Sequence, residues 1–268
     1  MGGRLGSRRP GKSRRDAASR DEDEDDTTRL GRAPMTASAF AGLRSVRIGP
    51  RDPEHVIVML GDAGQSPEDL ALAADALVAR TSGAAAVILG PAVADPTWRW
   101  FPETDGPADA AAIQAALDWV WPEVLKAAKA EGCSSSELSV FGFGQGATLA
   151  LAAAAAGYPF VCALALAGRL VGDLKARRAR SPDLFVSYGE NDLVMPPGAS
   201  QAAAEAFCRR GYSVALIPAP RLGREIALEQ LHHAASFLRG AIVGREPILP
   251  VSRAGRAKGR AASVTTRG

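Results

Sequence analysis

Short apolar runs alternate with longer amphipathic segments along most of this chain. Six nearly continuous apolar runs have the length of buried strands, at residues 56–60, 84–89, 138–143, 160–166, 184–188 and 213–217. Five longer segments have helical length and composition, at residues 67–80, 108–130, 145–156, 199–210 and 227–241. Strands that are apolar on both faces and alternate with helices are typical of a parallel sheet covered on both sides. The pattern predicts one α/β domain with a mostly parallel, doubly wound sheet.

Two segments complicate this pattern. Pro122 falls inside the longest predicted helix, where it should kink the helix or end its first half. Residues 147–168 contain no charged side chain and are long enough to cross a bilayer. Because Gly157-Tyr158-Pro159 divides them, we interpret them as a buried helix followed by a buried strand and expect no membrane span.

The two ends of the chain differ in composition from the middle. Residues 1–34 are rich in charge, Gly and Ser, and residues 245–268 have the composition of a basic linker. We expect a disordered N-terminal extension and a flexible C-terminal tail on either side of one folded domain at residues 35–244. An acidic run at residues 21–26 stands where an export signal would need an apolar segment, so we expect no signal peptide. The cysteines show no disulfide pattern, which fits a reducing, cytoplasmic setting.

Charge and cysteine content narrow the function classes. The formal net charge of +3 comes from the tails, because residues 35–244 carry more acidic than basic side chains. A nucleic-acid-binding surface needs clustered Lys and Arg on a folded face, so we expect no nucleic-acid partner. Cys133, Cys162 and Cys208 are widely spaced and odd in number, which disfavours a disulfide framework or a zinc site. We expect neither a metal nor a cofactor, and the sequence indicates no oligomeric state.

The candidate chemistry lies where predicted strands end, because ligand sites of doubly wound sheets form beyond the carboxyl ends of the strands. The third predicted strand runs into Gly-Phe-Gly-Gln-Gly at residues 142–146, which opens an alanine-rich helix. A strand, a sharp turn and a helix form the nucleophile elbow of α/β-hydrolases, but the serine of G-x-S-x-G is replaced by Gly144. Taken alone, the motif fits an ordinary glycine-rich turn equally well.

Three other strand ends carry candidate residues. The loop after the first strand contains Gly61 and Gly64, and its backbone N–H groups suit an oxyanion hole together with the N–H of Gln145. Asp192 follows the fifth strand, where it also fits a local turn cap, and Arg224 lies before the last helix. The order of elbow, strand-end Asp and last loop is the order Ser, Asp, His of α/β-hydrolases.

Together these motifs resemble the phospholipase/carboxylesterase family of serine hydrolases, relatives of the acyl-protein thioesterases. The family's elbow, G-F-S-Q-G, matches residues 142–146 at every position except Gly144. Its stretch H-G-x-x-D-x-V-V-P is similar to residues 188–196, which makes Asp192 the acid. The resemblance covers about residues 40–242 and implies an α/β-hydrolase fold.

Further matches and departures follow from the same resemblance. The family's G-H-x-I motif corresponds to residues 223–226, where Arg224 replaces the histidine. The family's Trp-Phe pair reappears as Trp100 and Phe101, which we expect to line the substrate pocket.

A third departure lies in the first loop. Aligned through the following Pro-Glu-Asp-Leu, the family's H-G-x-G falls on residues 61–64, so its histidine is lost and Ala63 supplies the oxyanion N–H. In this register Asp62 stands beside the hole, where a carboxylate would oppose negative charge on a substrate oxygen. A shifted register places Leu60 at the oxyanion position and recovers no histidine either.

The resemblance therefore implies a catalytic acid, Asp192, without the nucleophile and the base of the triad. Acyl transfer needs a nucleophile, a base and an acid that orients the base. Gly144 has no side chain, and the guanidinium of Arg224 is permanently protonated and cannot act as a base near neutral pH. We expect a degenerate hydrolase in which Arg224 either forms a salt bridge with Asp192 or remains a solvated loop cation.

The retained elbow glycines and Gln145 predict that the pocket still binds an acyl or carboxylate ligand at the start of the helix behind Gly144. Two alternatives stay open. One is an active carboxylesterase or thioesterase with a non-standard nucleophile, and the other is a structural or partner-binding protein whose pocket has collapsed.

Overall fold

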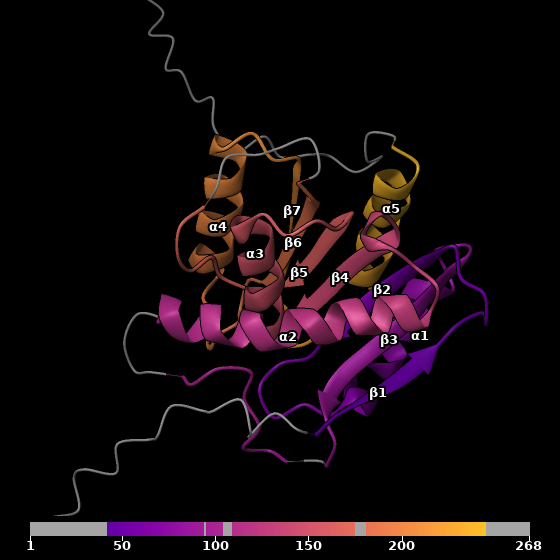
Figure 1. The fold of residues 1–268 in the computed structure, drawn as a ribbon. Helices are drawn as coiled ribbons and strands as arrows, with labels where there is room; N and C mark the ends of the chain where they lie inside the picture. Colours follow the sequence, from indigo (N-terminus) through magenta and orange to yellow (C-terminus); the bar gives the residue numbers. More distant parts are fainter. Residues whose placement is uncertain (1–41, 94, 104–108, 175–180, 245–268) are drawn as a thin grey trace, which may run out of the picture. The chain divides into compact units, whose positions relative to one another are not determined.

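A computed structural model describes residues 42–93, 95–103, 109–174 and 181–244, so the predicted extension at 1–34 and the tail at 245–268 lie outside the described residues. Its centre is a seven-stranded sheet with the order β1-β3-β2-β4-β5-β6-β7 (Figure 1). Every neighbouring pair is parallel except β1 with β3. The prediction of a single α/β domain with a mostly parallel sheet is confirmed.

All six predicted strands form, and none of their ends differs from the prediction by more than two residues. The seven strands are β1 (Leu43–Ile48), β2 (His55–Leu60), β3 (Ala84–Pro91), β4 (Leu138–Phe143), β5 (Cys162–Leu166), β6 (Asp183–Gly189) and β7 (Val214–Ala219). Strand β1 was not predicted; it pairs antiparallel with β3 at the edge of the sheet. An edge strand is covered less completely, and none of the residues of β1 is fully buried, so it lacks the continuous apolar run that identified the others.

The helices lie on both faces of the sheet, as predicted. They are η2 (Pro67–Leu70), α1 (Ala71–Val78), α2 (Ala110–Ala130), η3 (Ser135–Glu137), α3 (Gln145–Ala156), α4 (Pro197–Arg209) and α5 (Leu228–Ile242). Figure 1 shows helices on both sides of the sheet. Apolar side chains of α2, α3 and α4 share one buried cluster, and those of α1 and α5 share another. The sheet separates these two halves of the core.

The long helix α2 runs through Pro122 without a break. The prediction that this proline ends the first half of the helix is therefore wrong. Pro122 has no N–H to donate to the carbonyl of Asp118, one turn earlier. Because Asp118 is exposed, water can satisfy that carbonyl and the helix continues.

The charge-free stretch at residues 147–168 is a buried helix followed by a buried strand, as interpreted. In α3, every residue from Gln145 to Ala155 is buried, which explains why the helix is apolar on all sides. Every residue of β5 is buried as well. Within the described ranges, no helix combines the length and the hydropathy needed to cross a bilayer.

The parallel strands bring their carboxyl ends, and the loops that follow them, to one edge of the sheet. Backbone hydrogen bonds join these loops: the N–H of Gly144 donates to the carbonyl of Leu166, and the N–H of Asn191 donates to that of Leu222. The residues singled out after β2, β4, β6 and β7 are therefore neighbours in space.

Candidate functional site

A single residue, Gly144, turns the chain from β4 into α3. Its backbone angles, φ 58° and ψ −114°, lie in a region that costs L-residues free energy and that glycine adopts readily. The flanking glycines are needed for close packing. A Cβ on Gly142 would lie 2.3 Å from the carbonyl oxygen of Gly146, and one on Gly146 would lie 2.1 Å from that of Leu60. The turn has the sharp strand-to-helix geometry of a nucleophile elbow.

The carboxylate of Asp62 lies in the space that a side chain at position 144 would need. A Cβ built on Gly144 falls 2.0 Å from Oδ1 of Asp62 and 2.5 Å from its Oδ2. Oδ1 also accepts the backbone N–H of Gln145 at 2.9 Å, which is one of the two predicted oxyanion donors. The carboxylate thus occupies both the volume of a side chain at the elbow and one donor of the predicted oxyanion hole.

The other predicted donor, Ala63, follows Asp62 in the loop after β2. Within the described ranges, its backbone N–H has no hydrogen-bond partner. The loop is held next to the elbow by other contacts: the N–H of Asp62 donates to Oε1 of Gln65 at 2.7 Å, and the N–H of Gly146 donates to the carbonyl of Gly61 at 3.1 Å.

Arg224 links two carboxylates. Its Nε donates to Oδ2 of Asp62 at 2.8 Å, and its Nη2 lies 2.6 Å from the same oxygen. Its Nη1 donates to Oδ2 of Asp192 at 3.4 Å. The expected pairing of Arg224 with Asp192 is confirmed and the solvated-cation alternative is wrong, since the Arg224 side chain is only 20% exposed. The closer partner, Asp62, was not anticipated in this role.

Asp192 is held by the chain that follows it. Its side chain is fully buried, and Oδ1 accepts the backbone N–H groups of Val194 and Met195, both at 2.9 Å. This is the local turn cap that the sequence suggested, and the second oxygen is still free to face Arg224. Two carboxylates share one guanidinium here, and backbone N–H groups stabilise the excess negative charge.

The amide side chain of Gln145 joins the elbow to the loop before α2. Its Oε1 accepts the N–H of Trp100 at 2.9 Å, and its Nε2 donates to the carbonyl of Phe101 at 3.2 Å and to Oε1 of Glu103 at 3.1 Å. Trp100 is 1% exposed, and its indole N–H donates to the carbonyl of Gly61 at 2.8 Å. Trp100 therefore holds the two loops together, and only Phe101 of the predicted pair lines the adjoining cavity.

That cavity measures about 220 Å³ and opens beside Arg224. Its lining is mostly polar and consists of Phe101, Glu103, Gln145, Thr148, Arg169, Val194, Met195 and Arg224. Three of its polar lining residues, Thr148, Arg169 and Glu103, were not among the predicted binding residues. They come from α3 and from two loops without a motif, so only the folded arrangement shows that they meet.

A serine–histidine pair lies at the opposite edge of the sheet. Nε2 of His55, at the start of β2, is 3.0 Å from Oγ of Ser139 in β4. Burial lowers the pKa of His55 to about 4, so its imidazole is neutral at physiological pH. Ser139 has no exposed surface that a substrate could reach, and the pair is a buried hydrogen bond of the core.

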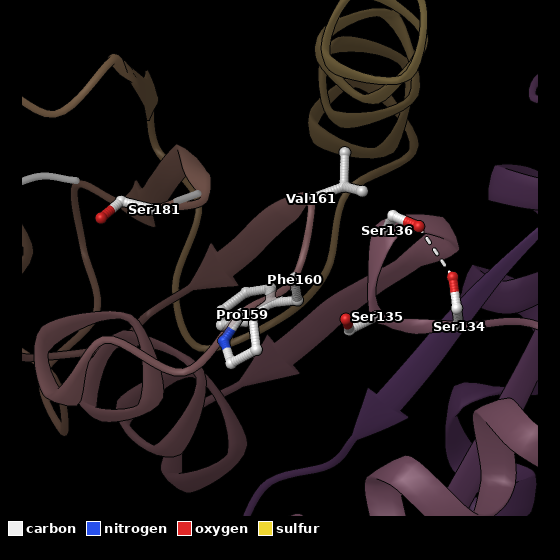
Figure 2. A pocket seen from close by; sticks show the side chains of 7 residues that line it. All are labelled: Ser134, Ser135, Ser136, Pro159, Phe160, Val161 and Ser181. Carbon is white, nitrogen blue, oxygen red and sulfur yellow. Dashed lines mark hydrogen bonds between the residues drawn. The ribbon is translucent and has the colours of Figure 1, made fainter. Parts of the chain in front are cut away.

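A larger pocket of about 450 Å³ also lies away from the elbow, where η3 and the start of β5 meet. Figure 2 shows its lining residues, Ser134, Ser135, Ser136, Pro159, Phe160, Val161 and Ser181. The hydroxyls of Ser134 and Ser136 bond each other at 2.7 Å, and no lining residue can act as an acid or base near neutral pH. Its size therefore does not make it the better candidate for chemistry.

In the part of the chain that the structure describes, no three His, Cys, Asp or Glu side chains are grouped so that they could hold a metal ion. The ionisable residues at the elbow are Asp62, Asp192 and Arg224, and those of the adjoining cavity are Glu103 and Arg169. The arrangement offers charge pairing and hydrogen bonding, without a hydroxyl or thiol next to a base.

Comparisons with known proteins agree with this fold. A profile described as phospholipase/carboxylesterase matches residues 70–242. The crystal structure of esterase PE8 is 20% identical with a TM-score of 0.66, covering 75% of this chain and 99% of that one. The crystal structure of the Bacillus cereus carboxylesterase is 17% identical with a TM-score of 0.64, covering 76% of this chain and 97% of that one. The crystal structure of Zea mays acyl-protein thioesterase 2 is 20% identical with a TM-score of 0.59, covering 74% of this chain and 99% of that one. No curated protein sequence matches the chain.

Proposed function

The chain belongs to the phospholipase/carboxylesterase family, and from this premise we propose that it is a member without serine-esterase activity that retains a small ligand pocket. The observation that carries the proposal is the position of the Asp62 carboxylate. It fills the space beside Gly144 and accepts the N–H of Gln145, so neither a nucleophile nor a substrate oxygen can occupy those places at the same time.

The residues near the elbow do not replace the missing nucleophile. The Thr148 hydroxyl donates to the carbonyl of Gly144 at 3.2 Å and accepts the N–H of Arg169 at 3.3 Å, with no base beside it. Arg224 stays protonated and cannot take a proton from any hydroxyl. Losing the serine or the histidine of a triad lowers turnover by about a millionfold, so the proposal predicts rates close to those of the uncatalysed reaction.

One observation favours the alternative of an unusual nucleophile, because the Asp62 carboxylate stands where a nucleophile would be. Attack by this carboxylate is opposed by its own contacts. Its Oδ1 already uses the donor that would have to stabilise the developing oxyanion, and its Oδ2 is bound to Arg224. We therefore propose that Asp62 acts as a plug of the former oxyanion hole.

The test is hydrolysis of p-nitrophenyl acetate and p-nitrophenyl butyrate by the full-length chain, together with labelling by an alkyl fluorophosphonate that reacts with activated serines. We expect no turnover above that of a heat-inactivated sample and no labelling. Asp62→Asn and Asp192→Asn are assayed in parallel. Wild-type turnover that Asp62→Asn abolishes would establish Asp62 as a nucleophile and end the proposal.

A further inference from the structure

The cavity beside the elbow contains a cation that no described residue neutralises. Arg169, in the loop after β5, lines the cavity, and within the described ranges its guanidinium forms no ion pair. Its Nε is buried and has no hydrogen-bond partner there. Because the Arg169 side chain lines the cavity and is only partly buried, its unpaired charge is available to an incoming acceptor.

The other cation of the cavity is not available in the same way. Arg224 already donates to Asp62 and Asp192, and these two carboxylates more than balance its charge. Glu103 lies at the exposed rim, where its carboxylate accepts from the side chain of Gln145. An anion that enters the cavity would therefore find its electrostatic partner in Arg169.

The backbone around Arg169 is fixed on both sides. Its N–H donates to the Thr148 hydroxyl at 3.3 Å, and the carbonyl of the preceding residue, Gly168, accepts from the buried Ser200 hydroxyl at 2.7 Å. The base of the side chain is thus held in place before any ligand arrives, which lowers the ordering cost of binding.

The size and lining of the cavity indicate the kind of anion. At about 220 Å³ it is smaller than a typical drug-sized site, and only Phe101, Val194 and Met195 give it apolar surface. A long acyl chain would leave most of its methylene groups outside. A guanidinium recognises the planar carboxylate through two parallel hydrogen bonds.

We propose that this cavity binds a small organic carboxylate, with Arg169 as its anchoring residue. The inference rests on the ligand pocket of the proposed function, and it narrows the expected acyl or carboxylate ligand to a short carboxylate. It does not depend on whether the chain hydrolyses esters.

The test is isothermal titration calorimetry of the full-length chain with butyrate, succinate, octanoate and inorganic phosphate. We expect butyrate or succinate to bind, with an affinity that falls at higher salt because the contact is an ion pair. Arg169→Gln should weaken this binding by at least about tenfold, since it removes a charge-assisted contact. Arg51→Gln, at an exposed loop position away from the cavity, is the matched control and should bind like the wild type.

Three results would overturn the inference: no carboxylate binding up to about 10 mM, unchanged binding by Arg169→Gln, or binding of phosphate or octanoate alone. Circular dichroism checks that the variant folds, and Arg169→Met, which keeps the apolar stem, replaces Arg169→Gln if it does not. The esterase assay is run on the same preparations. If the wild type hydrolyses the esters and also binds a carboxylate through Arg169, only the proposed absence of esterase activity is refuted. If the wild type neither hydrolyses the esters nor binds a carboxylate, only this inference is refuted.

Discussion

The contact between Asp62 and the elbow predicts that Gly144→Ser will destabilise the fold strongly. The new Cβ would lie 2.0 Å from Oδ1 of Asp62, so the carboxylate must leave its place. It then loses the N–H of Gln145 and its two contacts with Arg224. Serine would also have to adopt φ near 58°, where L-residues are strained.

The magnitude follows from these two costs. Strained backbone angles cost about 1–3 kcal/mol. Breaking a buried ion pair costs about 3–5 kcal/mol, and we take about 2–3 kcal/mol because the Arg224 and Asp62 side chains are 20% and 11% exposed. The sum of about 3–6 kcal/mol is a large part of the 5–15 kcal/mol by which domains are usually stable. This loss of unfolding free energy should lower the urea midpoint measured by Trp fluorescence and leave the m-value unchanged.

Two glycine variants and one double variant separate the causes. Gly132→Ser adds a side chain at φ 77° with nothing within 4 Å, so it reports strain alone, and Gly198→Ser has neither strain nor contact. Asp62→Ala combined with Gly144→Ser should recover part of the loss, because the space is then free. If Gly144→Ser costs no more stability than Gly132→Ser, or if Asp62→Ala gives no recovery, the Asp62 carboxylate does not occupy the space at the elbow.

Three further predictions concern pH, the long helix and restored chemistry. His55 has a pKa of about 4 in the fold and about 6.5 when unfolded, so stability is complete above pH 6.5 and falls by about 3 kcal/mol as the pH drops to 4. His55→Gln should flatten this part of the curve of urea midpoint against pH; an unchanged slope would contradict it. Pro122→Ala should raise the free energy of unfolding by about 1–3 kcal/mol, because it restores one backbone hydrogen bond at an exposed position, and a lower urea midpoint would count against it. The triple variant Asp62→Gly, Gly144→Ser, Arg224→His should hydrolyse p-nitrophenyl acetate weakly. Gly144→Ser with Arg224→His should show no turnover, because the displaced Asp62 carboxylate remains on the loop next to the new serine and the N–H of Gln145; equal rates of the two variants would argue against this role of Asp62.

The parts of the fold that the sequence predicts best are those whose local pattern and tertiary environment agree. The buried strands β2, β4 and β5 are apolar on both faces, so their sequences identify them directly. β1 gives a weaker signal because it is an edge strand, and its arginines at positions 44 and 47 are held by glutamates far away in the sequence. The continuity of α2 across Pro122 likewise depends on which side of the helix meets water.

The candidate site likewise contains residues that the sequence predicts and residues that it does not. The positions of Gly144, Asp192 and Arg224 follow from motif order, because a parallel sheet brings its strand ends to one edge. The sequence predicts that Asp62 lies beside the oxyanion hole. Its contacts with the elbow and with Arg224 could not be deduced from the sequence. Its contact with the elbow joins residues 82 positions apart and exists only because Gly144 leaves the space empty. Arg169 was missed because no motif marks it and its cavity is formed by several separate segments.

The position of Asp62 also constrains the order of substitutions by which a serine could be introduced at position 144. The carboxylate of Asp62 and any side chain at position 144 compete for one volume, so each excludes the other. A serine introduced first at position 144 would meet the Asp62 carboxylate and is expected to destabilise the fold. Asp62 must change before it, although that first step leaves Arg224 with one carboxylate in place of two. Under the proposed function, this steric exclusion favours one order of substitutions, in which Asp62 changes before Gly144.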